Sequence, residues 1–210
     1  MDEIRAIRGV VDRQFTAIWD AWKANDPLPF DDAYREEGLN AMAVIYRAGI
    51  KCQPGNFNSL LNPHSLMLSS IVRAIEGGRS IGRVPGPRSM EYLQSHCTLS
   101  IPFIHIMASV YADARCRAVN GESQFLNFGF ANDTQFVSHL MPYCDAMLID
   151  RKMRSMLVKE PLRSRIEFRA RLFSMSVFDE FIAYLDEIEA EVPLEQRTAA
   201  DEVYGLEAIP

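Results

Sequence analysis

The sequence predicts an α/β fold in which a helix-rich N-terminal part packs on a small parallel sheet. Apolar residues recur at steps of three and four along most of residues 1–120, which is typical of amphipathic helices. Two short segments of the last eighty residues, "DAMLID" and "RIEFRARLF", have strand patterns, and a helical segment lies between them. A short helical crossover returns a second strand beside the first in the same direction, so the pair should be parallel.

The chain is long enough for one domain with a full core, since 48% of its 210 residues are hydrophobic. We therefore expect a single domain over residues 1–210, made of a mainly helical part (1–120), a strand-helix-strand-helix part (121–192) and an acidic tail (193–210). The spacing of apolar residues and the Gly and Pro breaks predict helices in the first part near residues 4–22, 32–48, 63–75, 88–97 and 101–119. The last of these is the most apolar and should be central.

The pattern changes from Asn132 onward. Asn132 or Asp133 is expected to cap a short helix that runs to Met141. After the strand "DAMLID", residues 151–158 should form a short helix that Pro161 stops, and "RIEFRARLF" alternates as a half-buried strand does. A capping box at Ser176 and Asp179 should open the closing helix. Its expected inward face consists of Phe178, Phe181, Ile182, Leu185 and Ile188.

Composition restricts the environment and the partners. The longest mostly apolar segment, residues 99–112, is too short to span a bilayer, and the mixed charges of the first fifteen residues are not those of a secretory signal. The four cysteines form no C-x-x-C pair. We expect a cytoplasmic protein with reduced thiols and no membrane association.

The formal net charge of −6 argues against a general polyanion binder, yet the charge is unevenly distributed. The segment from residue 151 to residue 171, here called the basic segment, holds only two acidic residues, Glu160 and Glu167. Its basic residues are Arg151, Lys152, Arg154, Lys159, Arg163, Arg165, Arg169 and Arg171. This segment could bind phosphates, and it could equally be a solvated strand face that protects a sheet edge from aggregation.

The order of elements over residues 132–191 resembles the C-terminal half of a PIN-like nuclease domain. The resemblance depends on an aspartate opening a helix ("NDTQFVSHL"), a strand ending in aspartate ("DAMLIDRKM"), a basic strand and an amphipathic closing helix. It implies an α/β fold that cleaves RNA, or in some members DNA, with Mg²⁺ or Mn²⁺ held by carboxylates. Matched by position, Asp133 and Asp150 would be the catalytic and metal-binding residues.

The remaining expectations follow from this resemblance and from simple geometry. Arg151, Arg154 and Arg169 would position phosphates by bidentate hydrogen bonds. Asp145 begins the same strand that Asp150 ends, and the rise of five residues separates them by about 16 Å, too far to share one metal ion. A nuclease of this kind would have RNA or another nucleic acid as its partner, with a protein inhibitor or a second copy of the chain as further partners.

One departure from the family pattern leaves alternatives open. PIN-like domains begin with a strand whose aspartate completes the acidic site, and no such strand precedes the first helix here. Either the chain begins late relative to the family, or the missing first acid is replaced by Asp31, Asp32, Glu36 or Glu37. A further acid, which the family carries in its middle helices, could correspond to Glu76 or Glu91. Otherwise the site is degenerate and the protein is an inactive scaffold that binds nucleic acid or protein.

Each candidate residue also has a structural interpretation. Asp133 could be only a helix cap, and Asp150 could be a strand-end residue paired with Arg154. For Asp145 a structural role in a turn is favoured over a role as a metal ligand.

Overall fold

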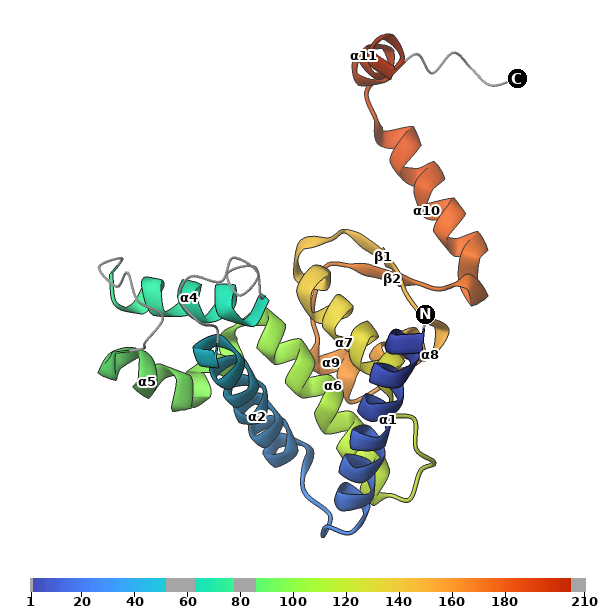
Figure 1. Ribbon diagram of the computed structural model, residues 1–210. Coiled ribbons are helices and arrows are strands. Elements are labelled where there is room, and N and C mark those ends of the chain that lie inside the picture. Colours follow the sequence, from blue (N-terminus) through green and yellow to red (C-terminus); the bar gives the residue numbers. More distant parts are fainter. Residues whose placement is uncertain (1, 52–62, 78–85, 205–210) are drawn as a thin grey trace.

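A computed structural model describes residues 2–51, 63–77 and 86–204 of the chain, and it combines many helices with one small parallel sheet (Figure 1). The expected mixture of helices and a small parallel sheet is thus confirmed. The N-terminal part contains α1 (Asp2–Lys23), α2 (Phe30–Lys51), α4 (Pro63–Ile75), α5 (Pro87–Gln94), the 3₁₀ helix η1 (His96–Ser100) and α6 (Pro102–Val119). These bounds agree closely with the helices predicted from apolar spacing.

Helix α6 is the centre of the molecule and joins two hydrophobic clusters. Toward α2, α4 and α5 it contributes Phe103 and Ile104 to one cluster, and toward α1 and α7 it contributes Ile106 and Val110 to the other. Buried alanines along α6, including Ala108, let neighbouring helices approach closely. The prediction that this helix is central is therefore correct.

The C-terminal part follows the predicted order of elements with shorter strands. It contains α7 (Phe128–Leu140), η2 (Met141–Tyr143), β1 (Ala146–Leu148), α8 (Arg151–Leu157), α9 (Leu162–Arg165), β2 (Arg171–Phe173), η3 (Met175–Val177), α10 (Phe178–Glu191) and α11 (Leu194–Tyr204). Strands β1 and β2 pair in parallel, with Met147 opposite Leu172. The strand predicted over residues 165–173 is present only at residues 171–173. Arg165 ends α9, and β1, which is only three residues long, offers residues 166–170 no partner.

Two predicted helix starts are wrong. Helix α7 begins at Phe128, where the side chain of Asn127 accepts a hydrogen bond from the Phe130 N–H at 2.9 Å. Asp133 therefore lies inside the helix and is not its cap. At α10 no side chain caps the first turn, and the Ser176 hydroxyl hydrogen-bonds that of Ser174 instead of closing the expected capping box.

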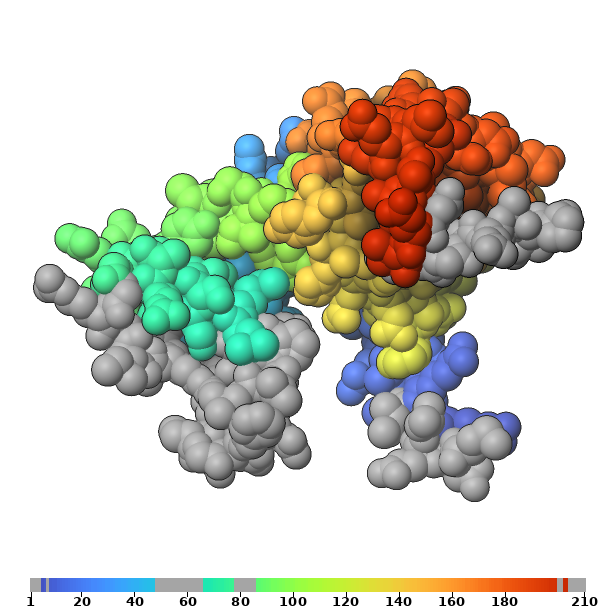
Figure 2. All heavy atoms as spheres, turned by 90° about the horizontal axis from the view of Figure 1, so that it is seen from above, coloured from blue at the N-terminus to red at the C-terminus, as the bar shows by residue number. Residues whose placement is uncertain are grey.

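Helix α10 extends away from the body and continues into α11 (Figure 1), and Figure 2 shows both in red, nearest the viewer from above. Its base packs on β2, where the rings of Phe181 and Tyr184 lie 5.3 and 5.4 Å from that of Phe173. The rest of the expected inward face is partly exposed. Its four other members are between 39% and 43% exposed, namely Phe178, Ile182, Leu185 and Ile188. The acidic tail, predicted as a peripheral segment, contains helix α11.

Two observations bear on the expected environment. None of the helices in the described ranges is long and apolar enough to cross a membrane. Cys97, Cys116 and Cys144 are free thiols, while Cys52 lies outside the described residues.

Candidate functional site

Asp150 lies at the carboxyl end of β1 and caps the helix that follows. One of its carboxylate oxygens, Oδ2, accepts hydrogen bonds from the Lys152 N–H at 2.7 Å and from the Met153 N–H at 3.4 Å. Its second oxygen, Oδ1, makes no hydrogen bond within the described part of the chain. Asp150 therefore combines a capping role with one free acceptor at the sheet edge where ligands of parallel sheets gather.

Asp133 lies on α7, which packs against α8, the helix that Asp150 caps. Burial, and after it the negative charge of Asp150, raise the pKa of the Asp133 carboxyl above its usual range. The two carboxylates are thus close enough for their charges to repel. The two acids lie 17 residues apart in sequence, on and next to helices that pack against each other.

A hard divalent cation suits this pair, with limits. Mg²⁺ is commonly bound by one or two carboxylates and completes its octahedron with waters and substrate phosphates. The free oxygen of Asp150 and the Asp133 carboxylate are two donors of this kind, and a cation there would reduce the repulsion between their charges. Among the described residues, however, no group of three or more acidic, His or Cys side chains could hold a metal ion. The donor set therefore fits an open site and not a closed protein cage.

Five of the six acids proposed to complete the site are engaged elsewhere. Asp31 forms an ion pair with Arg165, and Asp32 forms one with Arg35 at 3.3 Å. Glu36 and Glu37 both bind Arg115. Glu76 accepts hydrogen bonds from the backbone and hydroxyl of Ser89. Glu91 is exposed on α5.

The three arginines of the predicted site differ in their availability. Arg154 donates from Nε to the Leu172 carbonyl at 2.8 Å and pairs with Glu180 at 3.6 Å, so it joins α8 to β2 and α10. The alternative that Arg154 pairs with Asp150 is wrong. Arg169 pairs with Asp145 at 2.9 Å, and both side chains are exposed. Arg151, exposed and next to Asp150, has no ion-pair partner among the described residues.

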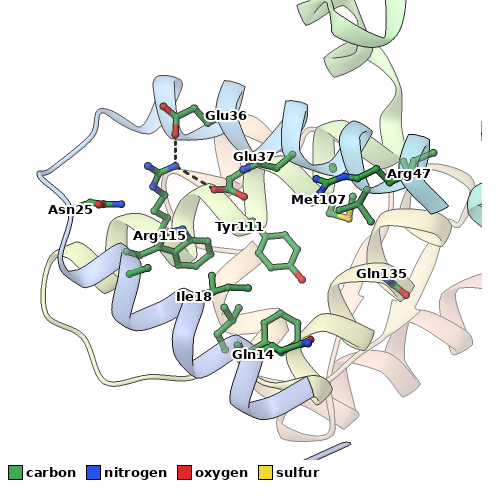
Figure 3. A pocket seen from close by; sticks show the side chains of 18 of the residues that line it. Gln14, Ile18, Asn25, Glu36, Glu37, Arg47, Met107, Tyr111, Arg115 and Gln135 are labelled. Carbon is green, nitrogen blue, oxygen red and sulfur yellow. Dashed lines mark hydrogen bonds and ion pairs between the residues drawn. The ribbon is translucent and has the colours of Figure 1, made fainter. Parts of the chain in front are cut away.

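A second site, which the sequence reasoning did not find, is a cleft of about 880 Å³ between α1, α2, α6 and α7. Figure 3 shows Arg115 reaching from α6 to Glu36 and Glu37 on α2 at one end, with Arg47 toward the other. Ile18 of α1 and Val44 of α2 line the walls and are exposed. Neither Asp133 nor Asp150 lines this cleft.

The charged end of the cleft is substantially withdrawn from water. Arg115 Nη1 donates to Glu36 at 2.6 Å and to Glu37 at 3.4 Å, and the Arg115 and Glu37 side chains are only 13% and 11% exposed. Burial raises the pKa of the Glu37 carboxyl more than Arg115 lowers it. Burial, together with the charge of Glu37, also raises the pKa of Tyr111 to about 12, so its phenol is neutral.

The sequence contained one signal for this cleft. Asp113, Arg115 and Arg117 interrupt an otherwise apolar, central helix, and a buried charge requires a partner. Asp113 and Arg117 satisfy one another at 2.6 Å, which leaves Arg115 to find its partners on α2. In comparisons with family models, curated proteins and solved structures, nothing matches this chain.

Proposed function

We propose that the chain is a metal-dependent ribonuclease of PIN-like type with Asp133 and Asp150 at its centre. The observation that supports the proposal is the packing of α7 on α8, which carries Asp133 toward Asp150 at the carboxyl end of β1, where burial and then the charge of Asp150 raise the pKa of Asp133. A divalent cation would neutralise the repulsion between two such carboxylates. The pair would hold Mg²⁺ or Mn²⁺, which supplies an activated water and polarises a phosphodiester.

Phosphate binding falls to the basic segment that begins beside Asp150. Arg151 is available without breaking any ion pair among the described residues, and Arg169 needs to leave only an exposed pair with Asp145, which is worth little. Arg154 is the least available of the three, because it holds the backbone of β2 and the base of α10. RNA cleavage should therefore depend on Arg151 more than on Arg154 for substrate contact.

A nuclease assay on mixed RNA substrates with Mn²⁺ or Mg²⁺ tests the proposal. We expect cleavage that a chelator abolishes, and a loss of at least about a hundredfold in Asp133→Asn and Asp150→Asn, the scale of removing a group that acts directly in catalysis. Asp20→Asn is the matched control, because Asp20 is exposed on α1 and belongs to neither site. Cleavage that survives chelation, or that Asp150→Asn leaves intact, would contradict the proposal.

The second candidate is an inactive scaffold of the same type that binds nucleic acid or a protein. The small number of metal ligands favours this candidate, since no third acid joins Asp133 and Asp150 among the described residues. RNA binding without cleavage, weakened by Arg151→Ala and unaffected by Mn²⁺, would support this candidate instead.

A further inference from the structure

Helix α10 has an apolar surface that the described residues of the chain leave partly exposed. Phe178, Ile182, Leu185 and Ile188, here called the α10 stripe, recur at helical spacing and are all exposed. Monomeric proteins rarely expose contiguous apolar patches without an interaction that uses them. Charged residues occupy much of the rest of the helix, and all of them are acidic.

The same chain contains a surface of complementary chemistry. A hollow of about 680 Å³ is lined mainly by apolar side chains, among them Leu157, Val158, Ile166 and Leu172. Arg163 borders it, and Lys159 directly follows Val158. Both cations are exposed, and neither has an ion-pair partner among the described residues. Glu167 is the one acid in the lining.

The geometry of β2 separates the hollow from the α10 of its own chain. Successive side chains of a strand point to opposite faces. Leu172 lines the hollow, while the next residue, Phe173, packs against Phe181 and Tyr184 at the base of α10. Arg171 also binds this base, through Glu187 at 2.7 Å. For α10 to cover its own hollow it would have to abandon these contacts.

We infer that the α10 stripe docks in the hollow of a second copy of this chain, with the acidic flank of α10 against Arg163 and Lys159. Asp186 and Glu189 of that flank have no ion-pair partner among the described residues and are free to take this role. Exchange of arms in both directions gives a twofold dimer with two identical contacts. Pairing of α10 with α10 of the second copy is disfavoured, because it would place two acidic flanks side by side.

The test is sedimentation velocity of the full chain over a concentration series, compared with single variants. Wild type is expected to dimerise with a dissociation constant of about 10 μM or tighter, and Ile182→Glu and Arg163→Glu should each weaken it at least about tenfold. Ala183→Glu is the matched control, because Ala183 lies on the same helix outside the stripe, and it should leave the constant unchanged. If Ile182→Glu lowers the thermal stability of the monomer, Leu185→Gln replaces it.

Mixing the two weakened variants distinguishes the proposed contact from others. Ile182→Glu retains an intact hollow and Arg163→Glu retains an intact α10 stripe, so a mixed dimer contains one intact contact, whereas neither variant alone contains any. We expect the mixture to dimerise more tightly than either component. A monomeric wild type, an ineffective Arg163→Glu, or a mixture no tighter than its components would overturn the inference.

Discussion

Asp150 offers a test that separates its two roles, because capping requires a side-chain oxygen while cation binding requires a negative charge. Asp150→Ala removes both hydrogen bonds to the first turn of α8, at 2.7 and 3.4 Å. Loss of an aspartate cap costs about 1 kcal/mol of unfolding free energy, which lowers the Tm of a chain of this size by about 2–4 °C. Asp150→Asn keeps an oxygen in the capping position and removes only the charge.

Two small effects of opposite sign act in Asp150→Asn. The variant loses the attraction between the carboxylate and the N-terminus of α8, worth about 0.5 kcal/mol at an exposed position. It also relieves the repulsion that helps to raise the pKa of Asp133. The net change in stability without metal should therefore be close to zero.

Thermal unfolding followed by circular dichroism, first with chelator and then with Mn²⁺, measures both roles. At a Mn²⁺ concentration one hundred times its dissociation constant, wild type should gain about 2.7 kcal/mol, and both Asp150 variants should lose that gain. Asp150→Asn losing as much stability as Asp150→Ala in chelator would refute the assignment of the cap. A Mn²⁺ gain that persists in Asp150→Asn would refute the cation site.

Three further predictions follow from the electrostatics and hydrogen bonds. Burial and Asp150 raise the pKa of Asp133, so folding favours its protonated form, and the free energy of unfolding falls as the pH rises from about 4 through the raised pKa. In urea titrations without metal, Asp133→Asn should therefore become more stable relative to wild type over that pH range. Arg115→Met leaves Glu37 buried without a cation and should lower the free energy of unfolding by about 2–3 kcal/mol at pH 7, and by less at acidic pH. In urea unfolding, the double variant with Glu37→Gln should recover most of that free energy. Tyr34→Phe removes the 2.7 Å hydrogen bond to His105 Nδ1 and should lower the free energy of unfolding in urea by about 1 kcal/mol. An unchanged free energy of unfolding would show that this hydrogen bond does not stabilise the fold.

The helices were predictable because their signal is local. Apolar spacing of three and four residues, together with the Gly and Pro breaks, indicated α1, α2, α4 and α6, and the parallel pairing of β1 and β2 followed from a short helical crossover. The length of β2 was not predictable in this way. Residues 166–172 alternate as a strand does, but pairing also depends on the length of the partner strand.

Helix starts failed for a different physical reason. Asn127, Asn132 and Asp133 are all good caps, and the choice among them depends on which turn of α7 the core can bury. Phe130 and Val137 of α7 are buried in the core, and the helix that buries them begins directly after Asn127. The Arg115 contacts with α2 were equally hidden, since Glu37 lies 78 residues away in sequence.

The candidate nuclease site and the α10 arm share a single short helix, and this constrains how either can change. Asp150 caps α8 at one end, and Arg154 in the same helix binds the Leu172 carbonyl of β2 and Glu180 of α10. Arg154, one turn from Asp150, is thus one of the contacts between the body and α10, together with those of Phe173 and Arg171. A dimer that docks α10 in the hollow of a second copy would add contacts at the other end of α8, where Leu157 and Val158 line the hollow. Under both proposals, RNA binding at Arg151 and dimerisation at Arg163 would be coupled through α8, and Arg154→Ala should reduce the change in RNA affinity between dilute and concentrated protein.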